Sequence, residues 1–470
     1  MSAYPAIGAE GDVTFPLALI EEVVSAAVVA GRRRRLLPGV AVVVFVLGCC
    51  LFSGEGYGEV VRKLAGWLAP LAGPGGWSVP GTGALARARR RAGPRPLKLL
   101  FAALAGPLAG PATPGAHAFG RLVVALDGIL LDVPYTPANI AAFGPPPSRH
   151  GSAGFPQVRL VTLAACGTHG LLDTAFRGRT AARSSEQDLA RTIAGRGRLG
   201  AGMLVVADRN FCGYPSAAVL AATGADFLIR AKSSQRFPVL EVLPDGSCRS
   251  VLPHPAAARA RWHRNGERRR RGSPLPPDPR SSLPGIPIRV IEATITIIRN
   301  GEPPRTERYR LITTLTDPRA APAAHLAACY AQRWEIETSY REIKTFTLRP
   351  ARVLRSGDPA GITQEIWALL CACQLTCNAR AQAAQAHGHD PDRISYTVTL
   401  RAIRRAIITG LPANAIQAEA LAQLQPPRRH RSHPRLIGAS TAKRRAARAG
   451  LTGTITYKIT IISQPDQPGP

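Results

Sequence analysis

Two short apolar runs, each ending in an aspartate, decide the fold. Leu122–Leu126 (LVVAL) is followed by Asp127, and Met203–Ala207 (MLVVA) is followed by Asp208. Apolar runs of this length between turn signals are typical of strands that are buried in a sheet. A carboxylate directly after such a strand stands at a sheet edge on a rigid backbone. The strand, helix, strand, helix, strand order around these runs predicts an α/β layer with a mixed sheet.

The segments outward from these runs complete an α/β core that carries a β insertion. For the core we expect strands at 158–165, 171–176, 226–231 and 309–315, and helices at 186–193, 215–223 and 364–386. Residues 236–310 are β-rich instead, with runs at 239–243, 248–252 and 288–298. The Pro- and Arg-rich stretch 253–287 lies among these runs and predicts a long exposed basic loop.

Asp127 and Asp208 are candidate metal ligands. Two carboxylates, with a third from a helix, can hold a pair of Mg²⁺ ions ~4 Å apart. One ion then activates the attacking oxygen, and the other stabilises the leaving oxygen. An aspartate after a strand, taken alone, is more often a loop residue than a ligand.

A predicted helix over 323–346, free of proline and glycine, supplies a third carboxylate. Its residues 330–344 read YAQRWEIETSYREIK. At about 100° per residue, four polar residues fall within roughly 60° on one face of this helix: Tyr330, Arg333, Glu337 and Lys344. Glu337 can complete a metal site, while Arg333 and Lys344 can grip phosphates and Tyr330 can donate to another. The alternative is an ordinary solvated helix face.

The charge balance points to a polyanionic partner. The 470 residues include 60 Lys+Arg against 30 Asp+Glu, a formal net charge of +30, which is typical of nucleic-acid binding. The first hundred residues predict a small helical module that ends in a basic helix, 83–92, with Arg87, Arg89, Arg90 and Arg91. Such a module is typical of a helix-turn-helix DNA reader, and a solvated basic helix is the alternative. The basic tail 425–449 predicts a DNA-contacting or mobile extension.

The cysteines and one apolar run bear on the cellular compartment. Nine cysteines in this length do not make a disulfide scaffold, and no paired cluster completes a zinc site, so we expect packed free thiols. Four arginines at 32–35 precede an apolar run, 40–52, that is shorter than the ~20 residues of a membrane span. We therefore expect a buried helix there, and a cytoplasmic protein with no membrane partner.

The chain resembles the insertion sequence four (IS-four) family of DDE transposases. The signature Tyr-x2-Arg-x3-Glu-x6-Lys occupies residues 330–344. Further similarity lies in LVVALDGILLDVPYTPANIAAFG around Asp127 and in MLVVADRNFCGYPSAAVLAATGADFLIRAK around Asp208. Residues 35–68 (RLLPGVAVVVFVLGCCLF and GYGEVVRKLAGWL) are similar to the family's amino-terminal domain. The similarity covers most of 32–405 in the same order, and the loop after Asp208 and the tail beyond 425 depart from it.

The resemblance implies an RNase H-like fold with a β insertion and a catalytic triad of Asp127, Asp208 and Glu337. These carboxylates would bind two Mg²⁺ ions, or Mn²⁺ in their place. Tyr330, Arg333 and Lys344 would contact the DNA end. Further DNA contacts are predicted by the basic helix 83–92 rather than by the resemblance: Arg87, Arg89, Arg90 and Arg91. Family members cut out an element at its inverted-repeat ends and join it to target DNA. Two ends must be brought together, so we expect a homodimer on double-stranded DNA in the bacterial nucleoid.

The resulting organisation has five parts. We expect a helical DNA-binding domain over 1–115, the RNase H-like core over 116–235 and 309–405, the β-rich insertion over 236–308 and a basic C-terminal extension over 406–470. Two other functions remain open. One is an RNase H-like nuclease without strand transfer, and the other is a DNA-binding relic that has lost catalysis.

Overall fold

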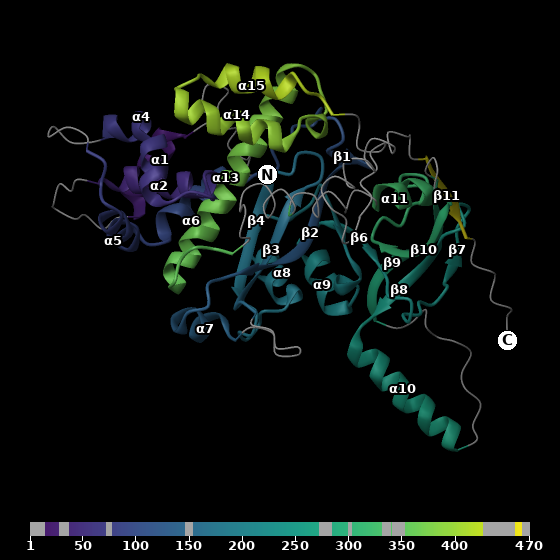
Figure 1. Ribbon diagram of the computed structural model, residues 1–470. Helices are drawn as coiled ribbons and strands as arrows, with labels where there is room; N and C mark the ends of the chain where they lie inside the picture. Colours follow the sequence, from purple (N-terminus) through teal and green to yellow (C-terminus); the bar gives the residue numbers. More distant parts are fainter. Residues whose placement is uncertain are drawn as a thin grey trace. The chain divides into compact units, whose positions relative to one another are not determined.

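The computed structural model describes residues 15–27, 37–71, 78–145, 154–271, 284–298, 303–330, 340, 353–425 and 456–462 (Figure 1). The chain divides into two compact units. Unit 1 comprises Met1–Ala116, Leu126–Ile193 and Glu335–Gln425, and unit 2 comprises His117–Ala125, Ala194–Trp334 and Pro426–Pro470. Strand β2 (Arg121–Asp132) contributes residues to both.

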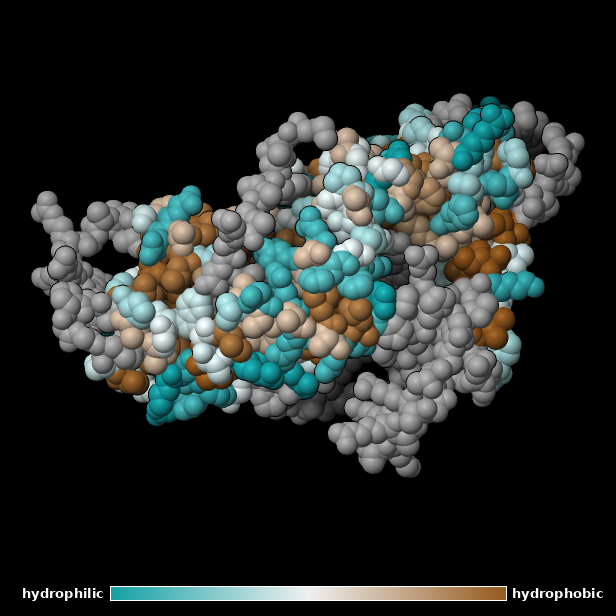
Figure 2. Space-filling view, turned by 90° about the horizontal axis from the view of Figure 1, so that it is seen from above, coloured by the Kyte–Doolittle hydropathy of each residue, from teal (hydrophilic) through white to brown (hydrophobic). Residues whose placement is uncertain are grey.

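The N-terminal part of unit 1 is helical, as the sequence predicts. Its elements are α1 (Leu17–Ala27), α2 (Gly39–Leu51), α3 (Tyr57–Lys63), α4 (Ala65–Leu68), η1 (Ala69–Leu71), α5 (Thr82–Ala92) and α6 (Arg95–Leu104). Every residue of α2 from Ala41 to Leu51 is buried, which confirms the expected core helix. No helix among the described residues combines the length and the apolar character of a membrane span. On the face seen in Figure 2, hydrophobic and hydrophilic residues form intermixed patches.

Helix α13 (Pro359–Ala386) is the centre of unit 1. Its residues are buried on all sides from Ile362 to Ala384, apart from a few partly exposed positions. A helix that is apolar all round has to be covered all round. Helices α2 and α6 from the start of the chain pack on it, together with α14 (Tyr396–Thr409) and α15 (Ala413–Leu421) (Figure 1). The core of unit 1 thus joins segments from both ends of the chain.

The sheet of unit 1 has the order β4-β3-β2. Strands β3 (Gln157–Ala165) and β4 (Leu171–Gly178) are antiparallel. Along the chain, helix α7 (Pro137–Phe143) precedes β3 and helix α8 (Glu186–Ala194) follows β4. Strand β2 does not end before Asp127 as predicted but continues to Asp132. The apolar residues Ile129–Leu131 extend it, and Asp132 forms a parallel bridge with Val353.

The sheet of unit 2 has the order β2-β5-β6-β10-β9-β8-β7, with β1 (His117–Ala118) paired to β2. Strands β5 (Met203–Ala207) and β6 (Asp226–Arg230) are parallel, and helix α9 (Tyr214–Ala222) connects them. Strand β10 (Arg305–Thr313) pairs antiparallel with both β6 and β9 (Gly285–Ile298). The insertion strands therefore continue the core sheet through β10, in the mixed α/β fold of an RNase H-like core.

The insertion contains a helix where the sequence predicted a loop. Strand β7 (Glu241–Val242) and strand β8 (Cys248–Pro253) precede helix α10 (Pro255–Arg270). The loop prediction for 253–287 is wrong over these residues. Alanine and arginine are strong helix formers. The prolines of this stretch lie before the helix, at its first position, where a helix tolerates them, or beyond its end.

The end of the chain contributes to both units. Helix α15 belongs to unit 1, whereas strand β11 (Thr456–Ile461) pairs with residues 293–298 of β9 in unit 2. Strand β8 pairs with residues 285–290 of the same strand, so β8 and β11 follow one another along β9. The basic tail predicted over 425–449 lies outside the described residues, except for Gln425.

The nine cysteines are all buried, and none forms a disulfide, as predicted. Burial raises the pKa of the Cys49 and Cys212 thiols to about 12. These thiols are therefore protonated packing groups at neutral pH.

Candidate active site

Asp127 lies half-buried in β2, directly after five buried residues of that strand. Its Oδ1 accepts the backbone N–H of Gly128 at 2.8 Å. Gly128 itself faces the side chain of Glu186, since a Cβ at this glycine would lie 2.9 Å from Glu186 Cγ and 3.0 Å from Oε1. The residue after Asp127 is thus packed against the Glu186 side chain, which would have to move to admit a Cβ there.

A buried tyrosine holds the backbone at Asp127. The hydroxyl of Tyr340 donates to the Asp127 carbonyl and lies against Thr162 of β3. Tyr340 is 5 % exposed and Thr162 is fully buried. No local sequence pattern indicates this hydrogen bond, because 213 residues separate Tyr340 from Asp127.

Asp208 lies in unit 2, directly after β5, and caps the short helix η2 (Arg209–Phe211). Its side chain accepts the backbone N–H of Asn210 at 2.8 Å. The four residues before it, Leu204–Ala207, are fully buried. The position predicted from the sequence, a carboxylate at the end of a buried strand, is therefore what the structure contains.

Tyr330 does not have the exposed hydroxyl that binding to DNA requires. It ends helix α11 (Ala323–Tyr330) and is 3 % exposed. Its hydroxyl donates to the carbonyl of Ala207 at 3.3 Å, one residue before Asp208. Its ring packs on Tyr309, with the ring centroids 6.1 Å apart. Tyr330 therefore supports the end of β5.

Arg333, Glu337 and Lys344 lie outside the described residues. Within the described ranges, no group of three or more His, Cys, Asp or Glu side chains could hold a metal ion. The metal prediction thus depends on Glu337 to add the third carboxylate. Asp127 and Asp208 themselves fit a hard divalent cation, because carboxylate oxygens are the ligands that Mg²⁺ takes.

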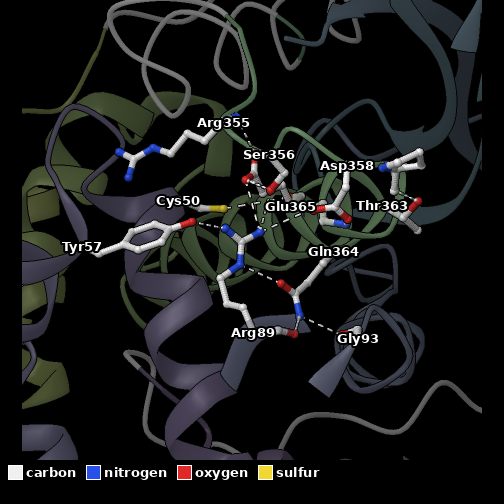
Figure 3. A network of polar contacts seen from close by, with 12 residues as sticks. Cys50, Tyr57, Arg89, Gly93, Arg355, Ser356, Asp358, Thr363, Gln364 and Glu365 are labelled. Carbon is white, nitrogen blue, oxygen red and sulfur yellow. Dashed lines mark hydrogen bonds and ion pairs between the residues drawn. The ribbon is translucent and has the colours of Figure 1, made fainter. Parts of the chain in front are cut away.

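The four arginines predicted as DNA contacts on α5 have two different environments. Arg87, Arg90 and Arg91 are exposed. Arg89 is 5 % exposed and is surrounded by acceptors within unit 1 (Figure 3). Its Nε donates to Gln364 at 2.8 Å, and its terminal nitrogens donate to Glu365 at 3.2 Å and to other acceptors: Tyr57 Oη, Ser356 Oγ and the Gly361 carbonyl.

Electrostatics keep Arg89 charged in this network. Burial by itself would lower the pKa of Arg89, but the negative charge of Glu365 and further interactions outweigh burial, so the pKa is raised. The side chains of Arg89 and Glu365 are 6 % and 7 % exposed. This ion pair joins α5 to α13, and it leaves the Arg89 guanidinium unable to reach DNA.

The arginines of the insertion are exposed along helix α10. Arg259, Arg264, Arg270 and Arg271 are all exposed, and at about 100° per residue they point to more than one side of the helix. Figure 1 shows α10 extending away from the strands of the insertion. These exposed arginines offer phosphate contacts on more than one side of the helix.

Two transposase family models match most of the chain. The family described as the insertion element 4 transposase N-terminal matches residues 12–102, and the family described as the transposase DDE domain matches residues 118–375. The transposase InsG for insertion sequence element IS4 of Escherichia coli (strain K12) is 27 % identical over 417 residues, 86 % of each chain. The piggyBac transposase synaptic complex with hairpin DNA, solved by cryo-EM, gives a TM-score of 0.44 at 9 % identity, covering 93 % of this chain and 84 % of that one.

The DDE match contains Asp127, Asp208 and Glu337 and spans more than half of the chain. The N-terminal match covers the helical module that precedes it. The chain therefore belongs to the insertion-sequence transposases with a DDE domain, enzymes that cleave DNA and transfer its strands.

Proposed function

We propose that Asp127, Asp208 and Glu337 bind two divalent cations, Mg²⁺ or Mn²⁺, and catalyse cleavage at the inverted-repeat ends of an insertion sequence and joining to target DNA. The observation that carries this proposal is the position of the two aspartates. Each lies directly after a buried strand segment, inside the region that matches the DDE domain. Family membership implies divalent metal use, and the identity and number of the ions are part of the proposal.

When bound, such a pair of cations would activate the attacking oxygen and stabilise the leaving oxygen of the phosphodiester. The chain contributes fixed negative charges on rigid backbone, which lowers the reorganisation that the reaction requires. Water and then the released 3′-hydroxyl are the nucleophiles, so no side chain becomes linked to DNA. The buried hydroxyls of Tyr330 and Tyr340, both bonded to backbone carbonyls, support this assignment.

Arginines and a lysine would hold the DNA. We assign Arg333 and Lys344 to phosphates at the element end, and Arg87, Arg90 and Arg91 of α5 to recognition of the repeat. Tyr330 and Arg89 are left out of this set, because both are buried and hydrogen-bonded within the protein. A homodimer that joins two ends, working in the bacterial cytoplasm on nucleoid DNA, completes the proposal.

Helix α10 is expected to bind DNA without reading its sequence. The variant changes four arginines to Gln: Arg259, Arg264, Arg270 and Arg271. The plot of the logarithm of its DNA association constant against the logarithm of the salt concentration should have a shallower slope, by about 0.9 for each phosphate that the variant no longer neutralises. The decrease in affinity should be equal on repeat and random duplexes. Fluorescence anisotropy between low and moderate salt measures both quantities.

The matched control changes the same four arginines to Lys, which keeps the charge. This variant should retain most of the wild-type slope. An unchanged slope in the Gln variant, or an equal decrease in both variants, would exclude α10 from phosphate binding.

The function itself is tested with a labelled fragment that carries the sequences flanking the gene. The protein is incubated with this fragment and a supercoiled plasmid, with Mg²⁺ or with EDTA, and the products are resolved on denaturing gels. Metal-dependent nicking at the repeat boundary, followed by joined products, supports the proposal. Nicking without joined products indicates a nuclease, and binding without nicking indicates a DNA-binding relic.

A further inference from the structure

The hydroxyl of Tyr340 connects the backbones of two neighbouring strands, β2 and β3. It donates to the carbonyl of Asp127 on β2 and accepts the backbone N–H of Thr162 on β3 at 3.2 Å. On β2 this connection is made at Asp127, the residue that carries the first carboxylate.

The directions of the hydrogen bonds follow from the hydrogens available. The single hydrogen of Tyr340 goes to the Asp127 carbonyl, so the hydroxyl of Thr162, 2.5 Å away, donates to the Tyr340 oxygen. All three groups are therefore satisfied inside a buried cluster. Removing the tyrosine oxygen would leave the Asp127 carbonyl, the Thr162 N–H and the Thr162 hydroxyl each without this partner.

The hydroxyl remains a donor at every working pH. Burial, followed by the negative charge of Asp127 and a smaller contribution from Glu186, raises the pKa of Tyr340 well above that of an exposed tyrosine. Hydrogen bonds from Thr162 act in the opposite direction but do not offset it. The protonated hydroxyl thus donates its hydrogen to the Asp127 carbonyl.

We propose that Tyr340 is a positioning residue for the metal site, which fixes the backbone of Asp127 so that its carboxylate meets the cations in one geometry. The inference rests on the proposed function of Asp127. Tyr330 makes a comparable hydrogen bond in unit 2, at the carbonyl before Asp208.

Tyr340→Phe tests the inference in the full-length protein. We expect the rate of strand cleavage at saturating DNA to fall about 10- to 100-fold, which is the usual effect of removing a group that orients a metal ligand. The Mg²⁺ concentration for half-maximal cleavage should rise, while the Kd for repeat DNA stays within about twofold. Titration with Mn²⁺, followed by electron paramagnetic resonance without DNA, should show weaker binding independently of turnover.

Two sets of controls separate positioning from general stability. Tyr396→Phe removes the hydroxyl of another buried tyrosine of unit 1, on α14, and should leave the Mg²⁺ dependence unchanged. Thr162→Ser keeps the hydroxyl that donates to Tyr340 and should retain activity. Thr162→Val lacks this hydroxyl and should move the Mg²⁺ dependence in the same direction as Tyr340→Phe.

Unchanged Mn²⁺ affinity and Mg²⁺ dependence in Tyr340→Phe would overturn the inference. So would decreases in DNA affinity and in thermal stability that match the decrease in cleavage. A different result would refute the proposed function itself. If the wild-type protein neither cleaves DNA nor binds Mn²⁺, the metal site is refuted before any variant is compared.

Discussion

Asp127→Asn, Asp208→Asn and Glu337→Gln are each expected to lower the rate of strand cleavage by about 10³-fold or more. Each substitution keeps the shape of the side chain but removes a negative charge that the proposed metal pair requires. A decrease of this size corresponds to about 4 kcal/mol of transition-state stabilisation. Single-turnover cleavage of labelled repeat DNA measures the rate, and anisotropy should show DNA affinity within about twofold of wild type.

Asp132→Asn is the matched control for the first of these variants. Asp132 also lies on β2, but it is five residues further along and accepts a hydrogen bond from Gln157. Its substitution should leave cleavage within a fewfold of wild type. Full cleavage by Glu337→Gln would refute the third ligand, and equal decreases in Asp132→Asn and Asp127→Asn would mean that the sheet, rather than the metal, is affected.

Arg89→Met is expected to lower the free energy of unfolding by about 3–5 kcal/mol, because it leaves the Glu365 carboxylate without its buried partner. Arg91→Met on the exposed side of the same helix should change stability by no more than about 0.5 kcal/mol. Urea unfolding followed by circular dichroism measures both. DNA binding should show the opposite order: Arg91→Met should reduce the affinity of the folded protein for repeat DNA, and Arg89→Met should have the smaller effect on that affinity.

Partial recovery in the double variant Arg89→Met/Glu365→Met would support this interpretation. Removing both charges eliminates the uncompensated carboxylate, so the double variant should be more stable than the sum of the single effects predicts. If Arg89→Met instead unfolds like wild type and binds DNA more weakly, Arg89 is a DNA contact and the network of Figure 3 is not essential.

Elements with a strong local pattern could be predicted from the sequence alone. Strand β5 spans the predicted residues, Met203–Ala207. A short, unbroken apolar run between turn residues is typical of a strand that is buried within a sheet. The apolar run at 40–52 forms helix α2 for a similar reason. The aspartates could be placed because each follows such a run directly in the sequence.

Features that depend on distant partners could not be predicted in this way. The ion pair of Arg89 joins residues 276 positions apart, so nothing beside Arg89 identifies Glu365. A weaker signal was present, since Leu85 lies one turn before Arg89 and both are buried. Tyr340 has no such signal, because its role follows from the groups that it meets on β2 and β3. Helix α10 was missed because nearby prolines suggested a loop.

The pairing of β11 with β9 has a consequence for how the protein is made. Strand β9 meets β8 and β10 soon after it leaves the ribosome, but residues 293–298 find their partner on one side only when 456–461 have been synthesised. At about 5–20 residues per second, this edge stays open for roughly ten to thirty seconds. An open strand edge is a template for pairing with other chains. A gene copy that loses its 3′ end would therefore encode all three carboxylates and yet yield a protein that associates through β9.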